Sequence, residues 1–400
     1  MYQNQQNLYN FKLNGANLII HHKPEFNTQY TSIELPFGGL SKYLLLDEKI
    51  INIEPGSAHL LEHSVLDTED NNFFSYFMRK GARCNGYTHL ASTVFSFEMV
   101  KLDLIVLQEF LYHIIEGEVN NETLTKQKEI ILSEINSRNP FPPIIKHGLK
   151  KILQNEYNYF TVIGESNDVE NLDKINLVLL KKYIYSFNHL DLITFGPKDP
   201  NEIIDWFKNI MKLNSDKSQG KIKWDLNNNN ETSGLVVCDK TDLTLLMIFK
   251  EKIINNVQMI KKQTIMRTFM ELCIEGFIKI NGNKLEAHMD YFNNLGISIF
   301  MTKASSEKEF IYIKSLISKS ESGVTNNLNN DTLDLIKTKI ISNLLAQYDY
   351  PDRISTQLHW LSRYNYSLDD YILMVQNVTT EEVNEHIEYL FSHIDNNLAY

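Results

Sequence analysis

The sequence predicts an α+β fold built from two similar halves. Strand-like and helix-like patterns mix from the N-terminus to Lys212, which is typical of layered folds. A polar segment from Lys212 to Ser233, with asparagine at each of 227–230, then interrupts the hydrophobic pattern. After it, a pattern of strands and helices begins again. We therefore expect a first domain at 1–212, a linker at 213–232 and a second, similar domain at 233–400.

In the first half, short apolar or alternating runs predict strands at 16–22, 30–35, 93–98 and 190–195. Helical spacing, together with the glycine and proline residues that end it, predicts helices at 58–66, 72–80, 102–115, 121–138 and 172–187. Ser57 is the expected N-cap of the first helix, and Gly81 ends the second.

The second half repeats this mixture. Strands are predicted at 235–237, 243–249 and 297–302, and helices at 258–280 and along the remainder of the chain. A predicted helix at 284–293 followed by the last of these strands would echo helix 73–80 followed by strand 93–98. This echo is the internal evidence for two related halves.

Composition narrows the class of protein. The net charge of −11 argues against a nucleic-acid partner, because phosphate binding needs a basic surface. Three widely spaced cysteines support neither a disulfide framework nor a thiolate metal site. The polar N-terminus shows no secretory signal, and no apolar run is long enough to cross a bilayer. We therefore expect a cytoplasmic protein.

One short motif carries most of the chemistry. In His59-Leu60-Leu61-Glu62-His63, the two histidines stand four residues apart, so both imidazoles share one helix face. Two such ligands suit Zn²⁺, and a catalytic zinc site keeps a position open for water. Glu62 lies on the same side and is the expected general base. The alternative is an ordinary polar helix face.

The third metal ligand must come from another element. The helix at 121–138 offers Glu129 and Glu134. Glu134 is one turn from Ile130 and Ile131, which places it toward the buried side, where a carboxylate needs a partner such as a metal. Glu129 lies on a more exposed face, so a solvated charge is expected there.

With these residues in view, the chain resembles the inverted-zincin family of pitrilysin, insulin-degrading enzyme and mitochondrial processing peptidase. The resemblance rests on the motif His59–His63, on Ile130–Ile135 around the third ligand, and on Gly81–Thr88, which is similar to a strand of that family. Gly164 and Gly196 also stand where members carry glycine. In length the chain resembles the small bacterial branch, which includes subunits linked to the processing of ribosomally made peptides.

The resemblance implies an activity and a substrate mode. Each half would be an antiparallel sheet covered by helices, as in processing peptidases, and one Zn²⁺ per chain would be held by His59, His63 and Glu134. A peptide substrate would bind as an added strand beside Asn85, Gly86 and Tyr87. Removal of a leader peptide is one such role. In the alternative, this segment is an ordinary strand and Tyr87 only packs.

Two departures from the family pattern matter. Many members carry a second glutamate seven residues before the third ligand, where this chain has Gln127, which can hydrogen-bond a ligand but adds no charge. Complete catalytic units also use an Arg and a Tyr from a C-terminal half, and Ala287–Ser298 contains no arginine. We therefore expect a heterodimer in which a paralogous, zinc-free subunit supplies both.

Two other functions stay open. Some relatives are non-catalytic peptide-binding or assembly subunits, although those usually lose the zinc motif that is intact here. S-ribosylhomocysteine lyase carries a related helix motif, but it is a shorter chain and uses a cysteine ligand. Cleavage of a quenched peptide that is lost in Glu62→Gln, with zinc retained, separates these readings.

Overall fold

The computed structural model divides the chain into two compact units. The N-terminal unit comprises Met1–Asn139, Asn158–Asp225 and Tyr350–His359, and the C-terminal unit comprises Pro140–Tyr157, Leu226–Asp349 and Trp360–Tyr400. The structure describes residues 7–46, 49–67, 73–137, 142–214, 221–223, 232–253, 255–281, 285–292, 295–311 and 329–395.

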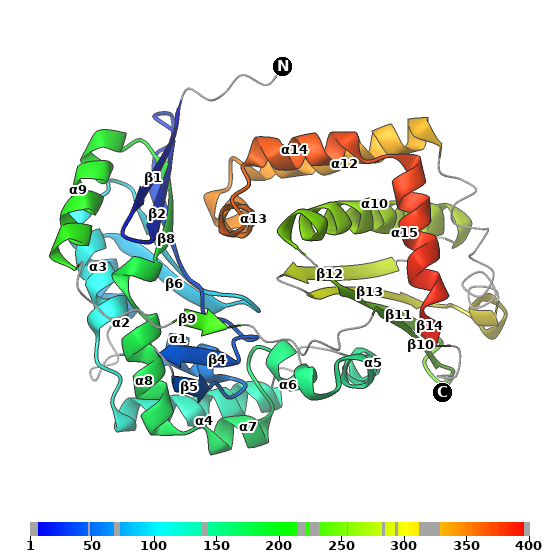
Figure 1. Cartoon of the computed structure of the whole chain (residues 1–400), viewed down its shortest axis with the longest axis horizontal. Helices are drawn as coiled ribbons and strands as arrows, with labels where there is room; N and C mark the ends of the chain where they lie inside the picture. The colour runs from blue at the N-terminus through cyan, green and yellow to red at the C-terminus, as the bar shows by residue number, and fades with distance from the viewer. Residues whose placement is uncertain are drawn as a thin grey trace. The chain divides into compact units, whose positions relative to one another are not determined.

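A six-stranded sheet forms the base of the N-terminal unit (Figure 1). Its strands, in spatial order, are β1 (Leu8–Leu13), β2 (Ala16–His22), β8 (Asp191–Gly196), β3 (Gln29–Leu35), β7 (Thr93–Met99) and β6 (Ala82–Thr88). All neighbours are antiparallel except β2 and β8. Within the described sheet, β6 is therefore an edge strand with one backbone side unpaired.

Helices cover one face of this sheet. They are α1 (Ser57–Leu66), α2 (Phe73–Arg79), α3 (Leu104–Glu116), α4 (Asn121–Ser137), α7 (Ser166–Asn171), α8 (Lys174–Ile184) and α9 (Pro200–Leu213). The cluster of buried side chains beneath them includes Leu60, Leu61, Phe95 and Phe110. The N-terminal unit also contains a small three-stranded sheet and the short helix α6 (Tyr157–Phe160). The strands of this sheet, in spatial order, are β5 (Lys49–Asn52), β4 (Tyr43–Leu46) and β9 (Lys221–Lys223).

The C-terminal unit is a second helix-covered sheet. Its strands, in order, are β12 (Leu285–Phe292), β13 (Leu295–Lys303), β11 (Thr244–Lys252), β10 (Ser233–Asp239) and β14 (Ile394–Asp395). Its helices are α5 (Pro143–Leu153), α10 (Asn256–Asn281), α12 (Asn330–Gln347), α14 (Leu368–Asn377), α15 (Thr380–Ser392) and the end of α13 (Pro351–Arg363). The residues of α13 up to His359 belong to the N-terminal unit.

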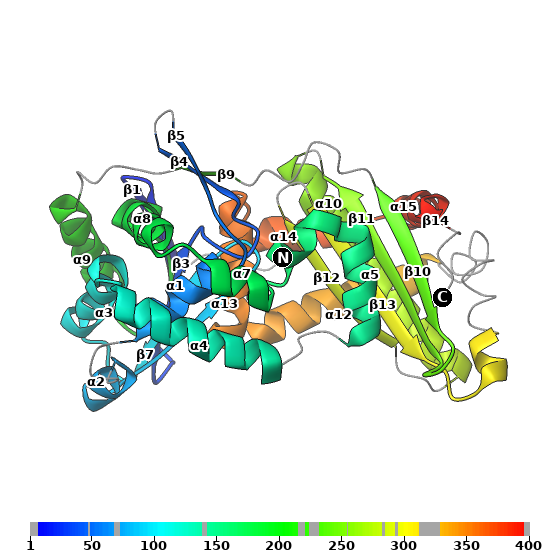
Figure 2. The ribbon, with the colours of Figure 1, turned by 90° about the horizontal axis from the view of Figure 1, so that it is seen from below.

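Helices α5 and α10 cover opposite faces of this second sheet. Gly148 of α5 lies against the side chains of Leu246 and Ile248, and Figure 2 shows α5 across β10 and β11. Phe249, which points to the other face, packs near Phe300, which in turn contacts Phe269 of α10. The expectation of an α+β fold with two similar, antiparallel-rich, helix-covered halves is confirmed.

Two local expectations were wrong, and one strand of the six-stranded sheet was missed. Ser57 does not cap α1, because Gly56 takes the N-cap position with φ of 85° and Ser57 Oγ donates to the Glu54 carbonyl instead. Residues 285–292 form strand β12 rather than a helix, paired antiparallel with β13. Strand β1 was not anticipated.

Each half of the sequence contributes one segment to the unit that the other half mainly forms. Pro140–Tyr157 belongs to the C-terminal unit, and Tyr350–His359 belongs to the N-terminal unit. Residues 215–220 and 224–231 of the expected linker lie outside the described residues. Domain bounds at 1–212 and 233–400 therefore stay a proposal.

Candidate active site

Helix α1 presents the motif from a fixed position. Its left-handed start at Gly56 leaves no room for a side chain, since a Cβ there would lie 2.7 Å from the Ile163 carbonyl oxygen. Leu60 and Leu61 are fully buried beneath the helix and anchor it in the core. Because these leucines face inward, the polar residues of the motif are directed toward α4 and β6, which α1 contacts.

Glu134 of α4 meets both histidines of α1. Its Oε2 lies 3.5 Å from His59 Nε2 and 3.8 Å from His63 Nε2. The two imidazole rings are 4.6 Å apart, centroid to centroid. Three side chains that were expected to share a metal ion are thus brought together from two helices. Glu129 on the same helix is exposed.

The residues present fit a zinc ion. With ligand bonds of about 2.0–2.2 Å in a tetrahedral site, two ligand atoms stand roughly 3.4 Å apart, close to the distances between Glu134 and the two histidines. Both ring nitrogens of His59 are buried and make no hydrogen bond within the described structure. A buried imidazole without a hydrogen-bond partner is costly unless something else occupies its lone pair.

Glu62 is buried beside the histidines, with 5% of its surface exposed. Its Oε2 accepts a hydrogen bond from Thr88 Oγ1 at 3.2 Å and lies 3.3 Å from His59 Nδ1. His59 therefore turns Nδ1 to Glu62 and Nε2 to Glu134. This division leaves Glu62 beside the three ligand atoms and hydrogen-bonded to strand β6.

His63 is oriented by a chain of polar side chains. Its Nδ1 lies 3.2 Å from Gln127 Oε1, and the Gln127 amide Nε2 donates to Asp67 Oδ2 at 2.9 Å. Lys126 Nζ in turn donates to both oxygens of Asp67, at 3.0 and 2.9 Å. A proton on His63 Nδ1 is thereby favoured, which directs the Nε2 lone pair toward Glu134 and the expected metal position.

Burial and neighbouring negative charge shift the pKa of His59 in opposite directions. Burial lowers the pKa of its imidazole, but the carboxylates of Glu62 and Glu134 outweigh it, so the pKa lies above its ordinary value. Burial, and then the charge of Glu62, raise the pKa of Tyr185, which stays a neutral phenol close to that carboxylate. A divalent cation would relieve the same concentration of negative charge.

Strand β6 runs past Glu62 at the edge of the sheet. A Cβ at Gly86 would lie 2.9 Å from Glu62 Oε1 and 2.5 Å from Leu66 Cδ1, so the absence of a side chain lets helix and strand approach. Asn85 is exposed. Tyr87 points to the opposite face of the sheet, where burial raises its pKa to about 12. On the face of the sheet where Glu62 lies, Tyr87 can therefore contact a peptide only through its backbone.

Sequence reasoning missed Thr88, Asp67 and Lys126. Thr88 lies only two residues beyond Gly86, and Asp67 immediately follows α1, but their contacts join residues 26 and 60 positions apart. No local pattern marks such pairs. A polar residue at the end of the motif helix was the one signal that could have drawn attention to Asp67.

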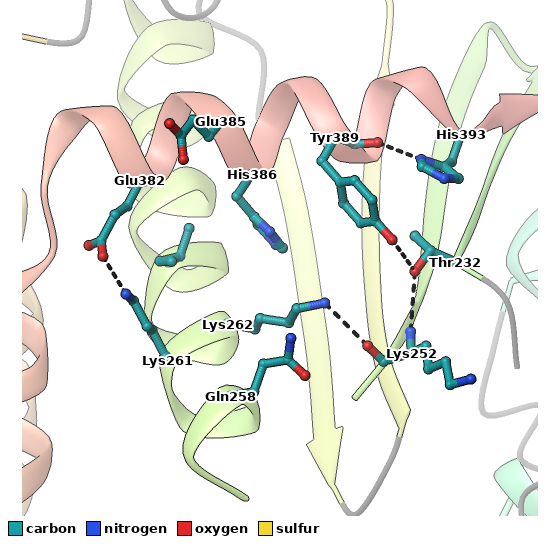
Figure 3. Close-up of a pocket in the computed structure, with 11 residues that line it drawn as sticks. Thr232, Lys252, Gln258, Lys261, Lys262, Glu382, Glu385, His386, Tyr389 and His393 are labelled. Atoms are coloured by element: carbon teal, nitrogen blue, oxygen red, sulfur yellow. Dashed lines mark hydrogen bonds and ion pairs between the residues drawn. The ribbon is translucent and has the colours of Figure 1, made fainter. Parts of the chain in front are cut away.

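A separate cavity of about 800 Å³ lies in the C-terminal unit, between α10 and α15 (Figure 3). Lys261 forms an ion pair with Glu382, and Lys262 lies 3.4 Å from Glu251 Oε1, while Tyr389 donates to Thr232 at 2.9 Å. Two of the lysines that line this cavity, Lys261 and Lys262, are thus already paired with carboxylates of the same unit. The groups that could do hydrolytic chemistry lie on α1 and α4 instead.

None of the helices in the described part of the chain is long and apolar enough to cross a membrane.

No family model matches the chain. Over 213 residues it is 28% identical to the "Uncharacterized zinc protease YmfH" of Bacillus subtilis (strain 168), and the match covers 50% of this chain and 48% of YmfH. The chain thus spans about half the length of this curated relative.

Solved structures share the fold along nearly the whole chain. A putative M16-like peptidase from Alicyclobacillus acidocaldarius matches with a TM-score of 0.82 and 17% identity, over 95% of this chain and 94% of the other. The inactive domain of an M16 peptidase from Pseudomonas fluorescens matches with a TM-score of 0.72 and 12% identity, over 97% and 96%. The chain therefore has the fold of M16-like peptidases along nearly its whole length, and about half of it is similar in sequence to a protein named as a zinc protease.

Proposed function

We propose that this chain is the zinc-carrying, catalytic subunit of a metalloendopeptidase. The observation that supports this most is the convergence of Glu134 on both His59 and His63, with Glu62 buried beside them. Inactive members of the same fold exist, as the Pseudomonas fluorescens domain shows. In this chain, by contrast, two imidazoles and two carboxylates of the described residues face one another.

His59, His63 and Glu134 would hold one Zn²⁺ per chain. When bound there, the zinc would act as a Lewis acid that polarises a peptide carbonyl and makes water a better nucleophile near neutral pH. Gln127 and Asp67 keep His63 in the tautomer that offers Nε2. Glu62 can take a proton from the attacking water at its carboxylate and deliver it to the leaving amine, while Thr88 holds that carboxylate beside β6.

The peptide substrate is expected to add as an extended strand to the free edge of β6. Backbone groups of Asn85, Gly86 and Tyr87 would form the ladder, and such main-chain hydrogen bonds do not by themselves select the side chains of the peptide. Gly86 brings this edge against Glu62, so a bound peptide would lie close to the base. Removal of a leader from a ribosomally made peptide, in the cytoplasm, is the role we expect.

A paralogous, zinc-free partner is expected to complete the substrate site as a heterodimer. The segment in which the family resemblance leads us to expect an Arg and a Tyr lies on β12 and β13, and 287–298 contains no arginine. Asn293 and Asn294 of that segment lie outside the described residues. The alternative is a non-catalytic peptide-binding or assembly subunit of the same family.

Hydrolysis of a quenched peptide, together with zinc content, tests the proposal. The chain should bind one equivalent of zinc at the His59 site and cleave the peptide when its paralogous partner is present. Glu62→Gln should keep the zinc and lose at least 10²-fold in kcat. Glu129→Gln, which neutralises an exposed carboxylate on α4, is the matched control and should leave both unchanged.

Zinc binding without cleavage in any combination of subunits would favour the assembly subunit. Full activity of the chain alone would eliminate the partner but leave the peptidase assignment standing. An active Glu62→Gln variant would contradict the role of Glu62 as the base.

A further inference from the structure

A second cluster of metal-binding side chains lies in the N-terminal unit, away from the zinc motif. Glu34 of β3 and Asp191 of β8 are directly opposite each other in the sheet, so their side chains share one face. His359 of α13 points between them, with Nδ1 3.5 Å from Glu34 Oε2 and 3.6 Å from Asp191 Oδ2. Ligand atoms of the three residues all lie within 4.8 Å of one another.

This cluster occupies the opposite face of the sheet from α1. The strand register aligns Gly86 with Phe95 and Ile33, on the face covered by α1. Glu34, the next residue after Ile33, therefore points to the other face. The cluster and the His59 site share no residue and are separated by the sheet itself.

His359 is almost completely buried, with 1% of its side chain exposed, and one of its nitrogens has no hydrogen-bond partner. Its Nε2 lies 2.8 Å from Ser32 Oγ, which can accept the ring proton. The other nitrogen, Nδ1, then directs a lone pair at two carboxylates. Asp191 Oδ1 is likewise buried and makes no hydrogen bond within the described structure.

A proton on Nδ1 would instead give two long ion pairs with the carboxylate oxygens, at 3.5 and 3.6 Å, rather than good hydrogen bonds. With the ring proton on Nε2, the Nδ1 lone pair faces two carboxylates, and a cation between these three groups would stabilise that arrangement. A divalent cation between the three would cancel both negative charges. The distances of 3.5 and 3.6 Å are also close to the roughly 3.4 Å expected between two ligands of one tetrahedral ion.

We propose that Glu34, Asp191 and His359 bind a second divalent cation, of the borderline type that accepts one imidazole and two carboxylates, such as Zn²⁺. Ser32 orients the imidazole, as outer hydrogen-bond partners do for metal-bound histidines. The ion would fasten the middle of α13 to β3 and β8. Its role is structural, and it does not depend on peptidase activity.

Metal counting tests the second site. Each protein is equilibrated with Zn²⁺, passed through a desalting column and analysed for bound zinc. The wild-type chain should retain two equivalents of zinc. The double variant His59→Ala/His63→Ala should retain one equivalent, and the same double variant with His359→Gln added should retain none. The matched control is His386→Gln, which changes a half-buried histidine whose Nε2 is 3.1 Å from Glu251 in the C-terminal unit, and this variant should retain two (Figure 3).

A measurement that leaves the cluster intact guards against loss of folding in His359→Gln. Zn²⁺ should raise the melting temperature of His59→Ala/His63→Ala, and a chelator should lower it again. The proposal is overturned if His59→Ala/His63→Ala retains no zinc and shows no such shift. It is also overturned if the remaining equivalent persists in a folded variant that carries His359→Gln.

Discussion

Gly86→Ala tests the approach of strand β6 to the catalytic carboxylate. The new Cβ would lie 2.9 Å from Glu62 Oε1, whereas ordinary contact begins at 3.4 Å, so the carboxylate must retreat by about 0.5 Å. Leu66 Cδ1, at 2.5 Å, is the end of a flexible side chain and can turn away. A misplacement of about 1 Å in a catalytic group costs on the order of 10²-fold. We therefore expect kcat/KM to fall roughly tenfold, with an overpacking cost of about 1–3 kcal/mol in the free energy of unfolding.

The assay combines peptide hydrolysis, zinc content and urea unfolding. Gly81→Ala is the matched control, because nothing lies within 4 Å of a Cβ there, although its φ of 81° is unfavourable for alanine. It should lose about 1 kcal/mol of stability and no activity. If Gly86→Ala keeps full activity and stability with zinc bound, the proposed contact between β6 and Glu62 is wrong.

The remaining predictions concern residues around the site and in the core. Gln127→Leu should weaken zinc binding about 10–100-fold in a chelator competition, because His63 loses its orienting partner; unchanged affinity would remove Gln127 from that role. Gln127→Glu should also weaken zinc binding, because the new carboxylate would face the carboxylate of Asp67. Adding Asp67→Asn should restore the zinc affinity. Burial, helped by Lys23, lowers the pKa of His21 to about 3, so its contribution to stability is complete above pH 6.5 and is lost as the pH falls toward 3. His21→Phe keeps the stacking on Phe195 and removes the titrating group, so at pH 5 wild type should have lost about 2 kcal/mol relative to this variant in urea titrations; parallel pH profiles would contradict this.

The elements that sequence could predict are those specified by local patterns. Helix α1 and the spacing of its two histidines follow from one helical turn, and seven of the fourteen strands in the described residues follow from short apolar runs bounded by turns. Its N-cap was mispredicted, because the glycine that begins α1 is selected by close packing against Ile163 rather than by hydrogen bonding. That packing partner is more than a hundred residues away in the sequence.

The strand at 285–292 shows how composition can conceal a pattern. Leu285, Ala287, Met289 and Tyr291 alternate with polar or aromatic residues, which is the period of a strand, yet several residues of this segment also favour helices. Pairing along the whole of β13 decides the outcome. Propensity is a weak guide where the sheet supplies all the backbone partners.

The polar partners of the candidate site were beyond sequence patterns for a related reason. Thr88 reaches Glu62 from a strand, and Asp67 reaches Gln127 across two helices. Ser32 and His359 are 327 positions apart. Such contacts depend on how elements pack, and a single sequence contains no periodic signal for them.

Anomalous X-ray scattering at the zinc edge, from crystals of the zinc-loaded chain, would show whether His59, His63 and Glu134 hold one zinc ion. We expect a peak about 2.0–2.2 Å from His59 Nε2, His63 Nε2 and a carboxylate oxygen of Glu134. If crystals grown in the presence of zinc show no anomalous density between these three atoms, His59, His63 and Glu134 do not form a zinc site.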